Sequence, residues 1–157
     1  MRNIFLFSCL FFIVGCTQTP SELRHLHPVT ITVLDNGQPM AGVFVTLSAK
    51  TPQEELWACN GTTDGSGIAK LRTKIRSFVG DGAQSGTYAV VLSKGADIPA
   101  ELAEGSSPNP VLEAKRNEFI EKNRVVPKVF ESAQTSPLEL VVEPKTGATL
   151  TVDVSKH

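Results

Sequence analysis

A strand, a tight turn and the start of a second strand are encoded in Val33-Leu34-Asp35-Asn36-Gly37-Gln38-Pro39-Met40-Ala41-Gly42-Val43. Asn-Gly favours two-residue hairpin turns, because both turn positions need a positive φ. On both sides of the turn, apolar side chains recur at every second position: Val29, Ile31, Val33, Val43, Val45 and Leu47. Such alternation is typical of strands that bury one face. The segment therefore predicts a β-hairpin, and Phe44 on the opposite face indicates that this face is partly covered.

The same alternation continues in five further segments, which span residues 56–60, 68–71, 87–93, 138–142 and 150–154. Turn-forming residues separate most of them, as in Thr63-Asp64-Gly65-Ser66-Gly67. Short strands at this spacing are typical of two packed antiparallel sheets. We therefore predict an all-β fold, a seven-stranded antiparallel Ig-like β-sandwich over residues 29–155.

One stretch has a different period. Residues 111–124 contain neither Gly nor Pro. Apolar or long aliphatic side chains recur in it every three or four positions, at Leu112, Lys115, Phe119 and Lys122. This spacing predicts a helix with a narrow apolar stripe, inserted before the last two strands. It lies in a connection of residues 94–137, which is long for a compact sandwich, and long connections often carry function.

Length and charge narrow the functional classes. The 157 residues suit one domain, and with 41% hydrophobic residues the chain can bury a core without metal or disulfide staples. Lys and Arg number 15 against 16 Asp and Glu, a formal net charge of -1. Nucleic-acid-binding proteins usually carry a clear basic excess, so this balance argues against a nucleic-acid partner. We also expect no cofactor.

The first sixteen residues have the pattern of a secretion signal. Arg2 precedes an apolar run from Ile4 to Val14, which is shorter than the about 20 residues that span a bilayer. The run ends in Ile13-Val14-Gly15-Cys16, which resembles the bacterial lipobox. The resemblance implies cleavage between Gly15 and Cys16 and lipidation of Cys16, which makes membrane lipid an expected partner. The alternative is an ordinary signal peptide with an incidental cysteine.

Residues 16–28 are polar, contain two prolines and are predicted to form a tether. Fully extended, such a segment reaches at most about 40 Å. His25 and His27 are interpreted as solvated linker residues rather than metal ligands, because no further ligand cluster lies nearby. In the best-known Gram-negative systems Asp after the lipidated cysteine retains a lipoprotein in the inner membrane. Thr17 therefore favours the outer membrane of a bacterial envelope.

Cysteine usage leaves one free thiol in the expected mature chain. Cys9 is removed with the signal and Cys16 is consumed by lipid, so Cys59 has no partner for an intramolecular disulfide. We interpret Cys59 as a buried core thiol, and a reactive or intermolecular thiol is the alternative.

Motifs of the common catalytic and metal sites are absent: Gly-x-Ser-x-Gly, His-Glu-x-x-His and Cys-x-x-Cys do not occur. The glycine-rich segment Gly80-Asp81-Gly82-Ala83-Gln84-Ser85-Gly86 is one residue too long for a dinucleotide loop and precedes a strand. We interpret it as a tight loop, and the alternative is a loop that contacts a ligand or partner. Trp57 is interpreted as a core residue, with contact to a sugar as the alternative.

Three motifs in sequence order resemble those of carboxypeptidase regulatory-like, or transthyretin-like, domains. They are the hairpin quoted above, with Asn36, Gly37, Pro39 and Gly42; the turn with Asp64 and Gly67; and the strand start Gly86-Thr87-Tyr88. Together with three further segments they are similar to small bacterial lipoproteins that carry one such domain behind a lipobox: Gly80-Asp81-Gly82-Ala83, Val126-Pro127-x-x-Phe130 and Thr135-Ser136-Pro137-Leu138. The resemblance covers about residues 28–154 and implies a prealbumin-like sandwich with a non-catalytic role.

Enzymes with related folds need residues that this chain lacks. A carboxypeptidase zinc site needs His-x-x-Glu, which does not occur, and intradiol dioxygenases bind iron through two Tyr, whereas this chain has only Tyr88. We therefore expect no enzyme and no metal site. The leading hypothesis is a membrane-anchored envelope lipoprotein, a non-catalytic binding or structural module that contacts a protein partner or surface component. The alternative is a sandwich that binds carbohydrate or a small ligand through Trp57 and the Gly80–Gly86 segment.

Overall fold

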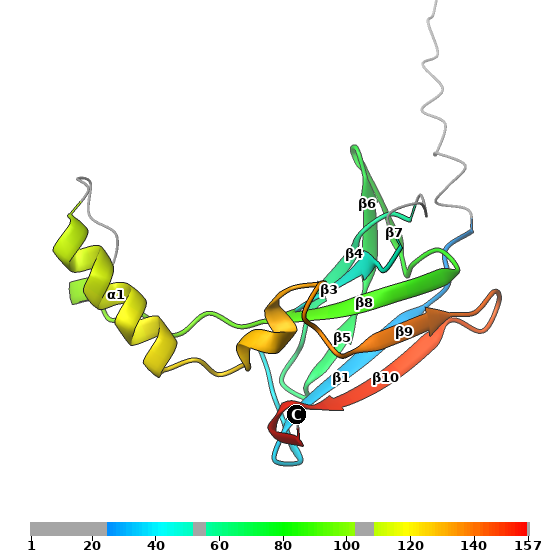
Figure 1. The fold of residues 1–157 in the computed structure, drawn as a ribbon. Helices are drawn as coiled ribbons and strands as arrows, with labels where there is room; N and C mark the ends of the chain where they lie inside the picture. Colours follow the sequence, from blue (N-terminus) through cyan, green and yellow to red (C-terminus); the bar gives the residue numbers. More distant parts are fainter. Residues whose placement is uncertain (1–24, 52–55, 103–108, 157) are drawn as a thin grey trace, which may run out of the picture.

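Two β-sheets pack together in a computed structural model of the chain (Figure 1), which describes residues 25–51, 56–102 and 109–156. The first sheet contains β1 (Val29–Asp35), β2 (Gln38–Pro39), β5 (Ile68–Lys70) and β10 (Ala148–Asp153). The second has the order β7 (Phe78–Asp81), β6 (Arg72–Ile75), β4 (Cys59–Thr62), β3 (Phe44–Ala49), β8 (Gly86–Ser93) and β9 (Glu139–Val142). The prediction of a mostly β, two-sheet architecture with one inserted α-helix is confirmed.

Each of the seven predicted segments overlaps a strand, although β4 shares only Cys59 and Asn60 with the predicted 56–60, and β2, β6 and β7 are additional. Apolar alternation did not predict the β6–β7 hairpin, because a threonine occupies one of its buried positions. Thr73 is fully buried, and its hydroxyl donates a hydrogen bond of 2.6 Å to the carbonyl of Gly82. A buried polar group of this kind is satisfied locally, so it can stand where the pattern would require an apolar side chain.

The prediction of a purely antiparallel sandwich is wrong at one place. Strands β1 and β10 pair in parallel, from Val29 opposite Ala148 to Leu34 opposite Asp153. Both strands begin at the same end of the molecule, where the carbonyl of Pro28 accepts a hydrogen bond of 2.9 Å from the amide of Ala148. Alternation has the same period in parallel and antiparallel strands, so it could not distinguish the two.

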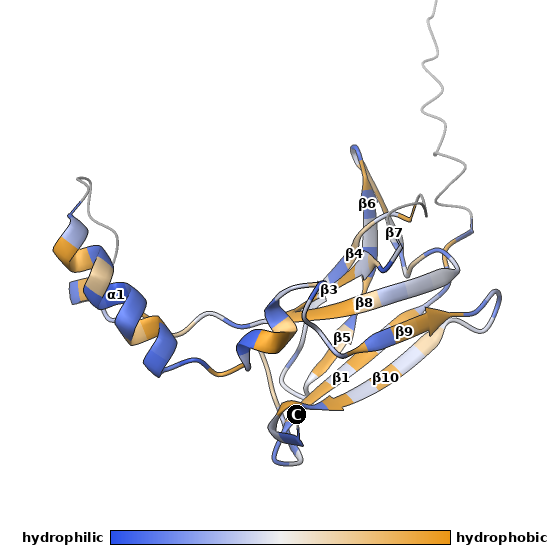
Figure 2. Cartoon of the chain, viewed as in Figure 1, coloured by the Kyte–Doolittle hydropathy of each residue, from blue (hydrophilic) through white to orange (hydrophobic). Residues whose placement is uncertain are grey.

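The core lies between the sheets and consists of the inward-facing half of each alternating strand. Tyr88 and Phe130 are its largest fully buried side chains. Phe130 belongs to the short 3₁₀-helix η3 (Lys128–Glu131), which contacts β8. Figure 2 shows the alternation of hydrophobic and hydrophilic residues along the strands. The outer face of β3 is not covered at Phe44, whose exposure is 45%.

The Asn36–Gly37 turn is present and has the conformation that the dipeptide favours. Both residues have positive φ, 49° and 78°, and Asp35 pairs with Gln38 across the turn. The paired hairpin is nevertheless only two residues long, because the chain turns at Gly42 and β3 joins the other sheet. The carboxylate of Asp153 holds the turn by accepting bonds of 3.1 Å and 3.0 Å from the amides of Asn36 and Gly37.

Asp153 should make the stability of this turn depend on pH. Its bonds from the Ser155 side chain, and further bonds from the backbones of Ser155 and Gly37, hold the pKa of Asp153 below its usual range. The stabilisation is therefore present above the unfolded-state pKa of about 3.9 and is lost as pH falls through the lower folded-state value. We expect Asp153→Asn to lower the melting temperature by several degrees at neutral pH and to have little effect in strong acid.

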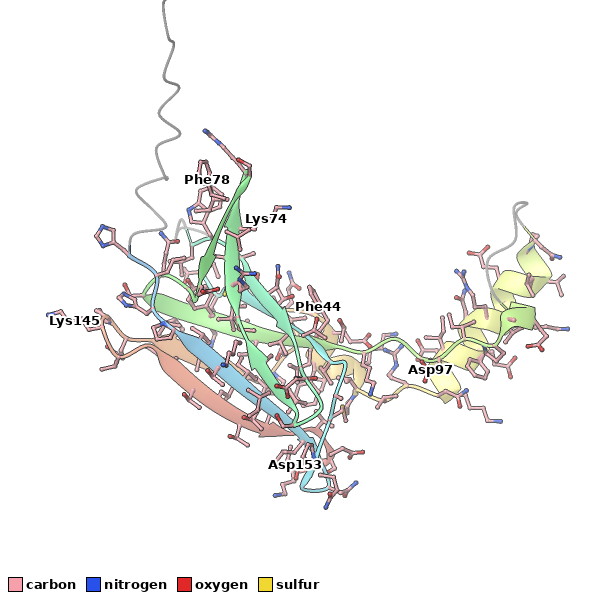
Figure 3. All side chains as sticks on the ribbon, turned by 180° about the vertical axis from the view of Figure 1, so that it is seen from behind. Phe44, Lys74, Phe78, Asp97, Lys145 and Asp153 are labelled. Atoms are coloured by element: carbon pink, nitrogen blue, oxygen red, sulfur yellow. The ribbon has the colours of Figure 1, made fainter. Side chains whose placement is uncertain are left out.

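Thermal denaturation followed by circular dichroism at both pH values measures this difference. Asp97→Asn is the matched control, because Asp97 is exposed and lies far from Asp153 (Figure 3). Equal losses from Asp153→Asn at neutral and acidic pH would contradict the role given to the ionised carboxylate.

The second predicted turn is also present, and Asp64 has the structural role expected of it. Its carboxylate accepts bonds of 2.6 Å and 2.9 Å from the hydroxyl and amide of Ser66 and one of 3.1 Å from the amide of Ile68. The bond from the Ser66 hydroxyl is the main cause that lowers the pKa of Asp64. Gly67 has a φ of 74° in this turn, and Gly42 has the same value in its own.

The predicted helix is α1 (Pro110–Lys122), two residues shorter than expected at its C-terminal end. Asn109 caps it by accepting bonds of 3.1 Å and 3.2 Å from the amides of Val111 and Leu112. None of its residues is buried, so the narrow apolar stripe does not pack into the core. The helix stands away from the two sheets (Figure 1), beside the short 3₁₀-helix η2 (Ala100–Leu102).

Candidate functional site

The first described residues are part of the fold, which corrects the prediction of a tether that extends to Pro28. The amide of His27 donates to the carbonyl of Ala83 over 2.7 Å, and the amide of Ala83 donates back over 3.0 Å. The Nδ1 atom of His27 accepts a bond of 3.1 Å from the amide of Lys145. His27 is therefore docked on the domain, against Ala83 and Lys145.

Two glycines make room for the entering chain. A Cβ on Gly82 would lie 1.9 Å from the carbonyl oxygen of His27, and a Cβ on Gly147 would lie 2.1 Å from that of Pro28. Both glycines also have positive φ, 96° and 72°. The segment His27–Pro28 thus lies in a seat formed by backbone alone, between the Gly82–Ala83 segment and the β9–β10 turn. We call this end of the sandwich the entry end.

Gly82 also connects the seat to the core. Its carbonyl accepts a bond of 2.6 Å from the Thr73 hydroxyl and one of 3.2 Å from the Cys59 thiol. Cys59 is fully buried, so the interpretation of a core thiol is confirmed. Burial raises the pKa of the Cys59 thiol to about 11, although its contact with Thr73 acts in the opposite direction.

Cys59 should be inert in the folded protein. With a pKa of about 11, the nucleophilic thiolate is a minute fraction near neutral pH. We expect iodoacetamide to leave Cys59 unmodified in the native protein and to alkylate it fully in denaturant, as read by mass spectrometry of the peptide that contains it. Rapid alkylation without denaturant would show that the thiol is accessible.

The glycine-rich segment is not the single loop that the sequence predicts. Gly80 and Asp81 lie on strand β7, where they pair with Thr73 and Arg72, and the Arg72 guanidinium binds the Asp81 carboxylate at 2.8 Å. Gly82 serves the seat, and Gly86 begins β8 beneath the side chain of Leu56. These four residues therefore make internal contacts.

Unlike these four residues, Trp57 is exposed at the entry end, so its interpretation as a core residue is wrong. Its exposure is 42%, and it precedes β4 rather than lying within a strand. The side-chain oxygen of Gln84 accepts a bond of 3.1 Å from the backbone amide of Trp57 and so ties this residue to the Gly82–Gly86 segment. A tethered backbone with an exposed indole is an arrangement that can contact a ligand or a surface.

Other groups at the entry end could not be found by motif searches. The backbone amide of Lys145 donates to the imidazole of His27, and no spacing in the sequence predicts their contact. The long connection of residues 94–137 leaves from the opposite end, after Ser93, and carries exposed apolar side chains that the sequence did not single out: Ile98, Val125 and Val129.

Within residues 25–51, 56–102 and 109–156, no group of three or more His, Cys, Asp or Glu side chains is placed to hold a metal ion. In the same part of the chain, no helix has the length and apolar character needed to cross a membrane. Gly15 and Cys16 lie outside the described residues, so their cleavage and lipidation stay predictions.

Comparison with known proteins adds no relative. No protein-family model matches the chain, and neither a curated protein nor a solved structure matches it.

Proposed function

We propose that the protein is a bacterial envelope lipoprotein, anchored through Cys16 in the outer membrane, whose domain is a non-catalytic module that binds a partner protein. We also propose that the domain is related to transthyretin-like, prealbumin-like sandwiches. The Ile13-Val14-Gly15-Cys16 sequence supports the anchor, and the order of the turn motifs around Asn36, Asp64 and Tyr88 supports the relationship.

One geometric observation supports the binding role: the chain enters the domain at one end and presents the helix α1 from the other. We call α1 the arm. β8 begins at the entry end, where Gly86 pairs with Val142, and finishes at Ser93 opposite Phe44. The connection that carries α1 starts there. A domain held by its entry end therefore presents α1 on the far side of the sheets from His27 (Figure 1).

Ion pairs hold the end of the arm in position, and its surface includes an exposed apolar side chain. Arg124 bonds to Glu131 of η3 and to Glu121 of α1, the latter at 2.6 Å, and these pairs tie the end of the helix to the domain. Val111 is 65% exposed near the beginning of the helix. A non-obligate interface is about as apolar as the rest of a protein surface, with a polar rim, and a surface of this composition fits that description.

Site-specific photocrosslinking in intact cells tests this role. A photoreactive amino acid at Val111 should yield a discrete protein adduct, because this side chain stands clear of the sheets. The same amino acid at Thr149, which is exposed on β10, is the matched control and should yield none. Equal adducts from both positions, or none from several arm positions, would contradict a partner that binds the arm.

Carbohydrate binding is the second candidate function, and the exposed indole of Trp57 is the observation that favours it. Trp57 is the single tryptophan of the chain, so its intrinsic fluorescence reports ligand contact directly. A saturable change in emission on adding soluble envelope glycans would support this function, and an unchanged emission would exclude these glycans.

A further inference from the structure

Exposed aromatic and basic side chains gather at the entry end. The strand register places Trp57 just before Cys59, level with the tip of the β6–β7 hairpin, because Cys59 pairs with Thr73 two residues before Ile75. Parallel pairing of β1 with β10 places the β9–β10 turn, with Lys145, beside the first described residues. Figure 3 shows Lys74, Phe78 and Lys145 at the end of the molecule away from Asp153.

These side chains have the chemistry of a membrane interface. Trp57 and Val79 are 42% and 47% exposed, and Phe78 is half-buried on the same hairpin. Among the described residues, Lys74, Arg76 and Lys145 form no ion pair, and all three are exposed. Lys74 pairs with Val79 on the hairpin, and Lys145 contacts His27 at the entry end. Tryptophan and lysine are enriched where a protein meets lipid headgroups, because each joins an apolar body to a polar end.

Charge alone would be a weak attraction here. Glu143 lies in the same β9–β10 turn, and the sequence between Thr51 and Leu56, outside the described residues, contains Glu54 and Glu55. The apolar and aromatic contact must therefore contribute most, with the lysines placed at headgroup level.

The length of the tether makes such a weak contact effective. Only residues 17–24, eight in all, separate Cys16 from His25. Fully extended, they allow the entry end to move at most about 30 Å from the lipid anchor. A short tether of this kind holds a surface at about millimolar effective concentration, so a contact too weak to bind unaided is occupied.

We propose that the entry end rests on the phospholipid bilayer, with Trp57, Phe78 and Val79 in the headgroup–acyl interface, so that α1 is directed away from the membrane. This proposal rests on the proposed function, because it requires the anchor at Cys16. It adds that the domain has one preferred orientation instead of rotating freely on its tether.

Quenching of Trp57 fluorescence by bilayer lipid tests the orientation. The full chain, made in a lipoprotein-processing bacterial host, is reconstituted in phosphatidylcholine–phosphatidylglycerol vesicles with or without bromine on the acyl chains. We expect a blue-shifted emission that brominated lipid reduces about twofold, as expected for an indole at the interface. Emission that is insensitive to brominated lipid and open to aqueous acrylamide would overturn the proposal, as would quenching by soluble glycan instead of lipid.

Two serine variants, one double and one single, distinguish an effect on the surface from an effect on the fold. Phe78→Ser combined with Val79→Ser should abolish most of the bromolipid quenching, whereas Phe44→Ser should leave it unchanged. Phe44 is a suitable control because it is 45% exposed on the same sheet at the opposite end. Thermal melts establish that each variant is folded, and unchanged quenching in a folded Phe78–Val79 variant would overturn the role of the hairpin.

Vesicle flotation separates this proposal from the one on which it rests. Protein that floats with the vesicles but shows no lipid quenching retains its anchor and lacks the docked orientation. Protein that does not float lacks the anchor, and both proposals then fail.

Discussion

Replacing Gly82 by alanine is expected to prevent the protein from folding stably. The new Cβ would lie 1.9 Å from the carbonyl oxygen of His27, a backbone atom that is itself held by the amide of Ala83 at 3.0 Å. The φ of 96° adds strain for any residue with a side chain. Moving the backbone would also disturb the Gly82 carbonyl, which serves both Thr73 and Cys59.

The expected loss is several kcal/mol out of the about 5–15 kcal/mol that stabilises a typical domain. Circular dichroism melts and soluble yield measure it. Gly65→Ala is the matched control, because a Cβ there would have no atom within 4 Å. A Gly82→Ala protein that melts with the parent would show that the entering chain is not seated as described.

Val90→Asp has the second large expected effect. Val90 is fully buried on β8 and belongs to the hydrophobic core between the two sheets. An unpaired carboxylate in that position costs about 3–5 kcal/mol or more, because nothing there replaces its hydration. We expect the variant to be insoluble or to lack a cooperative melting transition.

Val141→Asp controls for the substitution itself. Val141 is 49% exposed on β9, so the same change there should alter stability by no more than about 1 kcal/mol. A normal melting transition of Val90→Asp would mean that the inward face of β8 has been assigned to the wrong side.

Local chemistry made much of the fold predictable. The Asn36–Gly37 turn depends on two adjacent positive φ angles, which that dipeptide adopts readily, and the structure has both. The turn at Asp64 depends on a carboxylate that bonds the amides just after it. Alternation of small apolar residues predicted the inward faces, because burial on one side of a strand imposes a period of two.

What the sequence could not predict depends on contacts between distant residues. The seat of His27 is formed by backbone groups near Ala83 and Lys145, and no side-chain pattern marks it. The prediction for Trp57 was wrong because an aromatic next to a strand reads as core, whereas its backbone is held at the rim by Gln84. Parallel pairing of β1 with β10 joins the two ends of the domain and leaves no local trace.

At the candidate site, too, local features were predictable from the sequence and contacts between distant residues were not. The glycines of the Gly80–Gly86 segment were recognisable as special, but their purpose was visible only once Pro28 and His27 were placed beside Gly147 and Gly82. Glycine has no Cβ and therefore lets another backbone segment approach closely. The sequence does not say which segment makes that approach.

The proposed function depends on lipid attachment at Cys16, which mass spectrometry of the mature protein measures. The protein should be expressed in full in a bacterial host that processes lipoproteins and extracted from its membranes. We expect a chain that begins at Cys16, with the mass of residues 16–157 increased by that of a diacylglyceryl group and an N-terminal acyl chain. A mature chain that begins elsewhere, or at Cys16 without added lipid, would contradict it.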